Sequence, residues 1–153
     1  MLKRVWAALL AAIILSSVMP CMVAFATVYT DTETIYLEDG SYIDIEIVVR
    51  ESRALNTKNA SKTYNYRSAS GDLQWSGKVT GTFEYNGTTS TCTSSICTVT
   101  ITNTSWYTMS KSANKSGNRA YGYLTMGRDM LGVRVQTENL TMTLTCDKDG
   151  KLS

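Results

Sequence analysis

Apolar and polar residues alternate with a period of two along much of the chain. The segment DLQWSGKVTGTFEY, residues 72–85, places its large apolar side chains at odd positions and its polar side chains at even ones. Successive side chains of a strand point to opposite faces of the sheet, so this pattern predicts a strand with one buried and one hydrated face. Similar alternation predicts strands in four further segments: residues 43–49, 97–102, 131–135 and 140–146.

Turn-forming pairs lie between these segments. Asp39-Gly40, Asn86-Gly87 and Gly117-Asn118 each stand beside a predicted strand, where such pairs favour tight turns. A weakly helical stretch, residues 51–58, is interpreted as a loop, because no helical period separates the strands. We therefore predict an all-β fold, a single antiparallel β-sandwich of the immunoglobulin-like kind or a related barrel.

The beginning of the chain has the pattern of a secretory signal. Lys3 and Arg4 precede an apolar stretch, and Ala24-Phe25-Ala26 places small residues at the two positions that a signal peptidase recognises. The apolar stretch is interrupted before it reaches the ~20 residues needed to span a bilayer, and no later stretch is long enough. We expect a signal peptide at residues 1–26, one secreted β-domain at residues 27–153, and no membrane span after cleavage.

Composition excludes several kinds of chemistry. Two of the 15 basic residues and none of the 13 acidic ones lie in residues 1–26, so the remaining chain is formally neutral and lacks the basic face that nucleic acids require. The chain contains no histidine, which removes imidazole catalysis and the common nitrogen-ligated metal sites. Asp44 and Glu46, the best-placed carboxylate pair, have the spacing of a hydrated strand face. No enzymatic activity, metal or cofactor is predicted.

Three cysteines remain once Cys21 leaves with the signal peptide: Cys92, Cys97 and Cys146. An odd number outside the cytosol favours one disulfide and one thiol. A bond from either Cys92 or Cys97 to Cys146 stabilises the fold by ~4 kcal/mol, against ~2 kcal/mol for the short Cys92–Cys97 loop. Strand alternation favours Cys97 as the partner, because it and Cys146 fall on core-facing positions, although such a position also suits an unpaired cysteine.

Four tyrosines are the candidate binding residues. Tyr64 and Tyr66 share one face of a strand, and so do Tyr121 and Tyr123. The second pair alternates with small and aliphatic residues, so we expect these two side chains to point to solvent. Exposed aromatic side chains on a sheet bind sugar rings or protein partners through a large apolar area with a polar tip. The alternative interpretation is that tyrosine simply covers strand surfaces well.

Three segments, KVTGTFEYNGTTSTCTS, SWYTMSKSANKSGNRA and TLTCDKDGKLS, resemble a family of small secreted proteins of Gram-positive bacteria that is described as a domain of unknown function. The resemblance covers most of the chain from about Thr34 onward. Cysteines at the positions of Cys92 and Cys146 recur in that family, whereas the position of Cys97 varies. The resemblance therefore implies a Cys92–Cys146 disulfide and a bacterial setting, and it implies no activity.

Three classes of function are compatible with these features. We predict a secreted, non-enzymatic binding or interaction module that acts at the cell surface or in the extracellular medium on an unknown protein or glycan partner. A bacteriocin or toxin-like protein is the alternative, suggested by the threonine-rich amphipathic strands and opposed by the lack of a long, glycine-rich, uncharged hairpin. A histidine-independent hydrolase has no positive support in the sequence.

Overall fold

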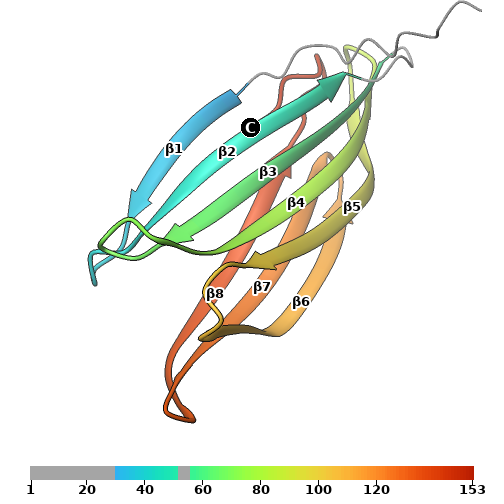
Figure 1. Cartoon of the computed structure of the whole chain (residues 1–153). Coiled ribbons are helices and arrows are strands. Elements are labelled where there is room, and N and C mark those ends of the chain that lie inside the picture. The colour runs from blue at the N-terminus through green and yellow to red at the C-terminus, as the bar shows by residue number, and fades with distance from the viewer. Residues whose placement is uncertain (1–29, 52–55) are drawn as a thin grey trace, which may run out of the picture.

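The structure, a computed structural model, describes residues 30–51 and 56–153 (Figure 1). The predicted signal peptide, residues 1–26, lies outside the described residues. Five strands form the first sheet: β1 (Thr30–Tyr36), β2 (Tyr42–Glu51), β3 (Thr57–Arg67), β4 (Leu73–Tyr85) and β5 (Ser90–Ile101). Three strands form the second: β6 (Trp106–Ser116), β7 (Arg119–Met130) and β8 (Val133–Thr145). All pairings between these strands are antiparallel, which confirms the predicted all-β sandwich.

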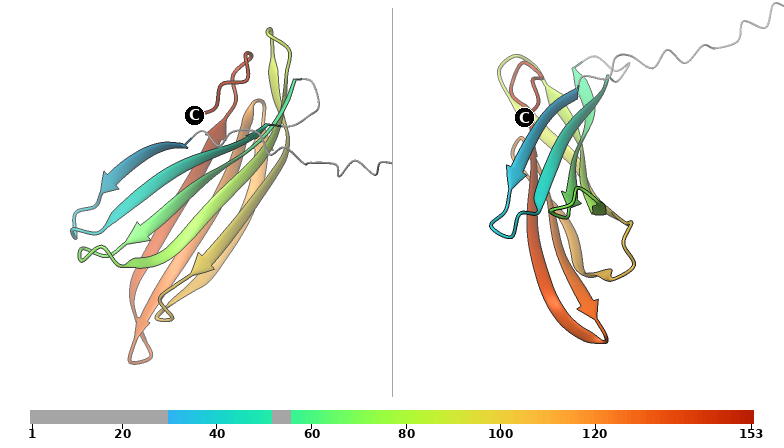
Figure 2. Two further views of the ribbon diagram at one scale, coloured as in Figure 1. Left: turned by 45° about the horizontal axis from the view of Figure 1, so that its top comes forward. Right: turned by 60° about the vertical axis from the view of Figure 1, so that its left-hand side comes forward.

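Consecutive strands pair with each other in both sheets, so the chain runs up and down as a meander. It changes sheets once, between β5 and β6, through residues 102–105. The interleaved strand order that Greek-key connections give an immunoglobulin domain does not occur among the described strands. The second sheet packs against β3, β4 and β5, while β1 and β2 lie to one side of it (Figure 2).

The core follows the alternation predicted for β4 and β8. Val79 and Phe83 of β4 are fully buried, and so are Met142 and Leu144 of β8. The segments 131–135 and 140–146, predicted as separate strands, contribute to one strand, β8, which pairs with β7 along its length. Turns also form where predicted, because the glycines at positions 40, 87 and 117 have φ angles of 81°, 81° and 55°.

An aromatic cluster joins the two sheets at one end of the core. The rings of Tyr66 and Trp75 are stacked, with centroids 5.0 Å apart and planes 4° apart. Trp106, the first residue of β6, meets both rings edge-on, at 5.3 Å from Tyr66 and 6.1 Å from Trp75. Aromatic pairs in these arrangements contribute more than the burial of their area alone.

The glycine at position 122 lets the sheets approach closely at the centre. A Cβ atom there would lie 2.9 Å from Met142 Cε and 3.3 Å from both Cys97 Sγ and Val79 Cβ. Beside this contact the sheets are also joined by hydrogen bonds, since the Ser95 hydroxyl donates to the carbonyl oxygen of Tyr121 at 3.1 Å. The sandwich is therefore tightly closed along the side where β5 meets β7.

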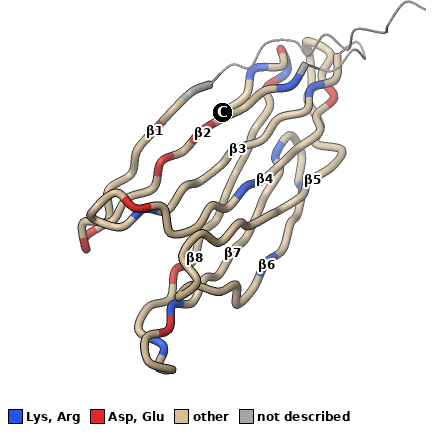
Figure 3. The backbone as a smooth tube through the Cα atoms, viewed as in Figure 1, with Lys and Arg blue, Asp and Glu red and all other residues tan. Residues whose placement is uncertain are grey.

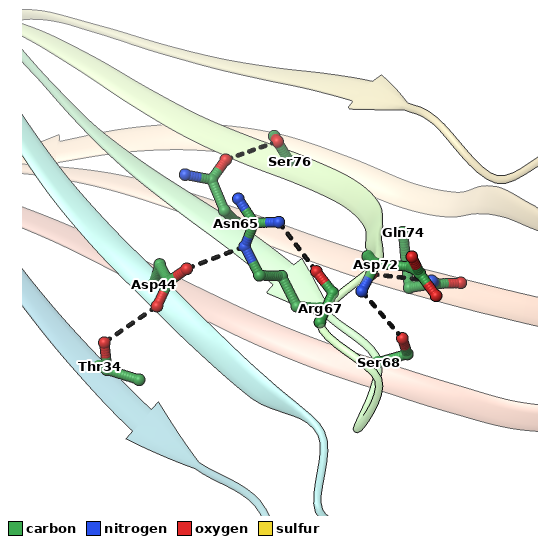
Figure 4. Close-up of polar contacts among 9 residues, drawn as sticks. Thr34, Asp44, Asn65, Arg67, Ser68, Asp72, Gln74 and Ser76 are labelled. Atoms are coloured by element: carbon green, nitrogen blue, oxygen red, sulfur yellow. Dashed lines mark hydrogen bonds and ion pairs between the residues drawn. The ribbon is translucent and has the colours of Figure 1, made fainter.

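The outer face of the first sheet carries charged and polar side chains (Figure 4). Asp44 of β2 accepts hydrogen bonds from Thr34 and from Arg67 Nε, both at 2.9 Å. The Ser76 hydroxyl donates to the Asn65 side chain at 2.7 Å. The Asp44–Arg67 ion pair is about one-third exposed, and pairs of this kind contribute only about 0 to 1 kcal/mol. This face is a hydrated surface, as its alternation predicts.

Candidate functional site

Tyr121 and Tyr123 lie side by side on the outer face of β7. Their ring centroids are 6.2 Å apart and their planes differ by 11°, so the two rings are nearly parallel. Ala120 and Leu124, which alternate with them, are buried in the core, and Tyr123 is 40% exposed. The outward orientation predicted from the alternation of small and aromatic residues is therefore observed.

The strand register places only uncharged polar residues beside these rings. Tyr123 lies between Ser112 of β6 and Thr141 of β8, and residues directly opposite each other project from the same face of the sheet. Tyr121 lies in the same way between Asn114 and Thr143. We call these six residues the tyrosine platform: Ser112, Asn114, Tyr121, Tyr123, Thr141 and Thr143.

The platform differs from the rest of the surface in its lack of charge. Residues 120–127 of β7 and 139–145 of β8 contain no Lys, Arg, Asp or Glu, whereas the first sheet carries both signs of charge (Figure 3). Hydroxyl and amide groups can donate and accept hydrogen bonds without the desolvation cost of an ion. The platform can therefore bind an uncharged ligand that offers both an apolar face and hydroxyl groups.

Tyr64 and Tyr66 also share a face, but that face is the buried one. They are 7% and 3% exposed, and burial raises the pKa of both phenols. The phenol oxygen of Tyr66 accepts a hydrogen bond of 3.0 Å from Gln136 of β8. Ala60, Tyr64 and Tyr66 are the apolar residues of β3, TKNASKTYNYR, so this strand turns them inward and leaves its lysine, serine, threonine and asparagine residues more exposed. These two tyrosines do not form a surface platform.

A recess lies at the end of the sandwich near the aromatic cluster. It has a volume of about 320 Å³ and is lined mainly by polar side chains, together with Trp106. Trp106 Nε1 and Arg128 Nε are buried, and neither has a hydrogen-bond partner among the described residues. No sequence motif marks this recess, because its lining comes from turns and strands far apart in the chain.

The three cysteines of the described residues are buried free thiols, and burial raises the pKa of each. Alternation alone would place Cys92 and Cys97, five residues apart, on opposite faces of β5. The pairing of β4 with β5 shifts by one residue, since Phe83 lies opposite Cys92 but Thr82 lies opposite Ser94. This β-bulge turns Cys92 toward the core as well, so the facing argument that favoured Cys97 over Cys92 is wrong.

Cys92 and Cys146 lie beside the same turn, the hairpin between β6 and β7. The backbone N–H of Cys92 donates to the carbonyl oxygen at position 117 at 2.8 Å, and that of Cys146 donates to the next carbonyl, Asn118, at 3.1 Å. Cys97, also on β5, faces a point further along β7, where its Sγ lies 4.0 Å from the carbonyl oxygen of Tyr123. Cys92 is thus placed next to Cys146 by two adjacent backbone groups.

Within residues 30–51 and 56–153, no group of three or more Cys, Asp or Glu side chains is arranged to hold a metal ion. In the same part of the chain, no helix is long and apolar enough to cross a membrane. Comparison with protein-family models, curated proteins and solved structures finds no match to this chain. Its class is therefore defined by its fold and surfaces: a two-sheet β-sandwich with an uncharged tyrosine platform.

Proposed function

We propose that this protein is a secreted, non-enzymatic binding module whose ligand is an uncharged glycan. The observation that carries the proposal is the pair of nearly parallel tyrosine rings, 6.2 Å apart, within a field of hydroxyl and amide side chains. A sugar ring has an apolar C–H face that can cover a tyrosine, and its hydroxyl groups can pair with serine, threonine and asparagine.

The shape of the platform favours a polymer over a small molecule. Small ligands bind in concave sites that enclose most of their surface, whereas the platform lies on the outer face of a three-stranded sheet. An extended chain of sugars can contact both rings at once, which makes the second contact effectively intramolecular. The ligand proposed is therefore a neutral polysaccharide.

We propose further that residues 1–26 are removed on export and that a Cys92–Cys146 disulfide forms outside the cytosol. The burial of both thiols beside one hairpin supports this pairing, as does the family resemblance of the sequence. The proposed bacterial origin and membership of that Gram-positive family rest on the resemblance alone.

The exported protein is expected to begin at Thr27, because Ala24-Phe25-Ala26 provides the small residues that signal peptidase recognises. Intact-mass measurement of protein recovered from the culture medium of a Gram-positive host tests this. Recovery of a membrane-retained species that still carries residues 1–26 would contradict it.

Replacement of both Tyr121 and Tyr123 by alanine is expected to weaken binding to a neutral polysaccharide more than about tenfold, since truncation of central aromatic contacts commonly costs 2 kcal/mol or more. Affinity electrophoresis against a panel of soluble neutral and acidic polysaccharides measures the effect. Tyr36→Ala is the matched control, because Tyr36 is also exposed but lies on β1, away from the platform. It should leave binding unchanged.

Tryptophan fluorescence distinguishes a ligand bound at the tyrosine platform from a ligand bound in the recess. Trp106 lines the recess, and the platform contains no tryptophan. A ligand on the platform should leave the emission spectrum nearly unchanged, whereas a ligand in the recess should shift it. Failure of the wild-type protein to bind any neutral polysaccharide, or equal binding by the double alanine variant, would refute the proposed function.

A further inference from the structure

The hairpin between β7 and β8 ends in a cluster of exposed apolar side chains. This hairpin extends beyond the end of the first sheet (Figures 1 and 2). Leu131 is fully exposed, and the other three apolar residues are each more than half exposed. We call these four residues the apolar tip: Met130, Leu131, Val133 and Val135. The sequence pattern of residues 131–135 predicted a strand, and the structure leaves its apolar side chains in solvent.

The conformation of Leu131 makes its presence at the tip unusual. Leu131 and the glycine at position 132 have φ angles of 51° and 78°, a pair of left-handed residues in a tight hairpin turn. Glycine and asparagine favour this turn, whereas a residue such as leucine is strained there by its Cβ atom. Neither turn geometry nor packing within the chain accounts for leucine at this position. A contact between Leu131 and another molecule would account for it.

A layer of aromatic and cationic side chains lies next to the apolar tip. Arg134 Nε donates to the Tyr107 hydroxyl at 2.8 Å, and the guanidinium carbon lies 5.7 Å from the centre of that ring. Arg134 is exposed, whereas Arg128 and the two acidic residues of the hairpin, Asp129 and Glu138, are half-buried, so the charge presented next to the tip is positive. In a bilayer the apolar side chains of the tip would contact the acyl chains. Tyrosine is favoured at the interface, and arginine can pair with anionic headgroups.

We propose that the apolar tip inserts into the surface of an anionic phospholipid bilayer as a peripheral anchor. A convex group of side chains can enter a fluid phase without a complementary pocket, and its burial there is favourable. The tip is too short to cross, because a membrane-spanning strand needs about 9 to 11 residues within the bilayer. This anchor is independent of the glycan proposed for the tyrosine platform.

Leu131→Asn tests the anchor without disturbing the fold, because asparagine tolerates the left-handed conformation better than leucine. We expect this variant of the secreted domain, residues 27–153, to keep its melting temperature and to bind vesicles of phosphatidylcholine and phosphatidylglycerol at least about tenfold more weakly in flotation assays. Arg134→Gln should reduce binding to these vesicles and its dependence on salt. Ile96→Asn is the matched control, since Ile96 is 54% exposed on β5; it should leave binding unchanged.

The anchor is overturned if wild-type protein does not bind these vesicles, or if Leu131→Asn binds them as tightly as wild type. Equal binding to pure phosphatidylcholine would overturn the assignment of anionic lipid. Self-association that Leu131→Asn abolishes, with no vesicle binding, would assign the tip to a second copy of the chain and overturn the proposal. Retained vesicle binding by the Tyr121 and Tyr123 double variant is expected, and it separates this test from that of the proposed function.

Discussion

Reduction of the proposed Cys92–Cys146 disulfide is expected to lower the free energy of unfolding by about 4 kcal/mol. The bond would close a loop of more than fifty residues, and in the loop-entropy description its main effect is to restrict the unfolded chain. Equilibrium unfolding in urea, with and without a reducing agent, measures the difference through the transition midpoint and slope. Peptide mapping under non-reducing conditions identifies the linked pair directly.

Two serine variants provide the controls for this measurement. Cys146→Ser removes the bond, so its stability should not respond to the reducing agent. Cys97→Ser keeps the bond and should retain the full response, after a separate loss of about 1 to 3 kcal/mol if the new hydroxyl group finds no partner. A Cys97–Cys146 or Cys92–Cys97 linkage in the peptide map would contradict the proposed pairing.

The cysteines also show where sequence alternation stops being informative. The strand predicted within residues 72–85 corresponds to β4, Leu73–Tyr85, because one face of this central strand packs on the second sheet and the other meets solvent. On β5 the same reasoning missed the bulge at Thr93. Thr93 has no register partner on β4, and this can be recognised only from the pairing of the two strands. One unpaired residue was enough to reverse the predicted orientation of Cys92.

The exposure of the candidate binding residues could be predicted from the sequence for some of them and not for others, because it depends on how the strands pack. Tyr121 and Tyr123 alternate with small and aliphatic residues, so their outward orientation could be read from the sequence. Tyr64 and Tyr66 have mainly polar neighbours, and only comparison of the two faces of β3 shows that the tyrosines belong inside. The apolar tip has a strand pattern, but its exposure depends on where the first sheet ends, which is a property of the tertiary structure.

Trp75→Ala is expected to destabilise the domain by about 3 to 5 kcal/mol, the range for loss of a large buried aromatic side chain. Trp75 is 1% exposed and packs against both Tyr66 and Trp106, so its removal leaves a cavity where the two sheets meet. Urea unfolding followed by circular dichroism gives the change in free energy, and an unchanged slope would show that the unfolded state is comparable.

Two further variants decide whether this loss reflects the aromatic cluster. Trp75→Phe should cost less than Trp75→Ala, because phenylalanine fills part of the cavity and removes Trp75 Nε1, a buried donor with no partner among the described residues. Ile96→Ala, at an exposed position on β5, should change stability by no more than about 0.5 kcal/mol. A loss below about 1.5 kcal/mol for Trp75→Ala would mean that the sheets hold together without the cluster, since even partial collapse around so large a cavity leaves a greater cost than that.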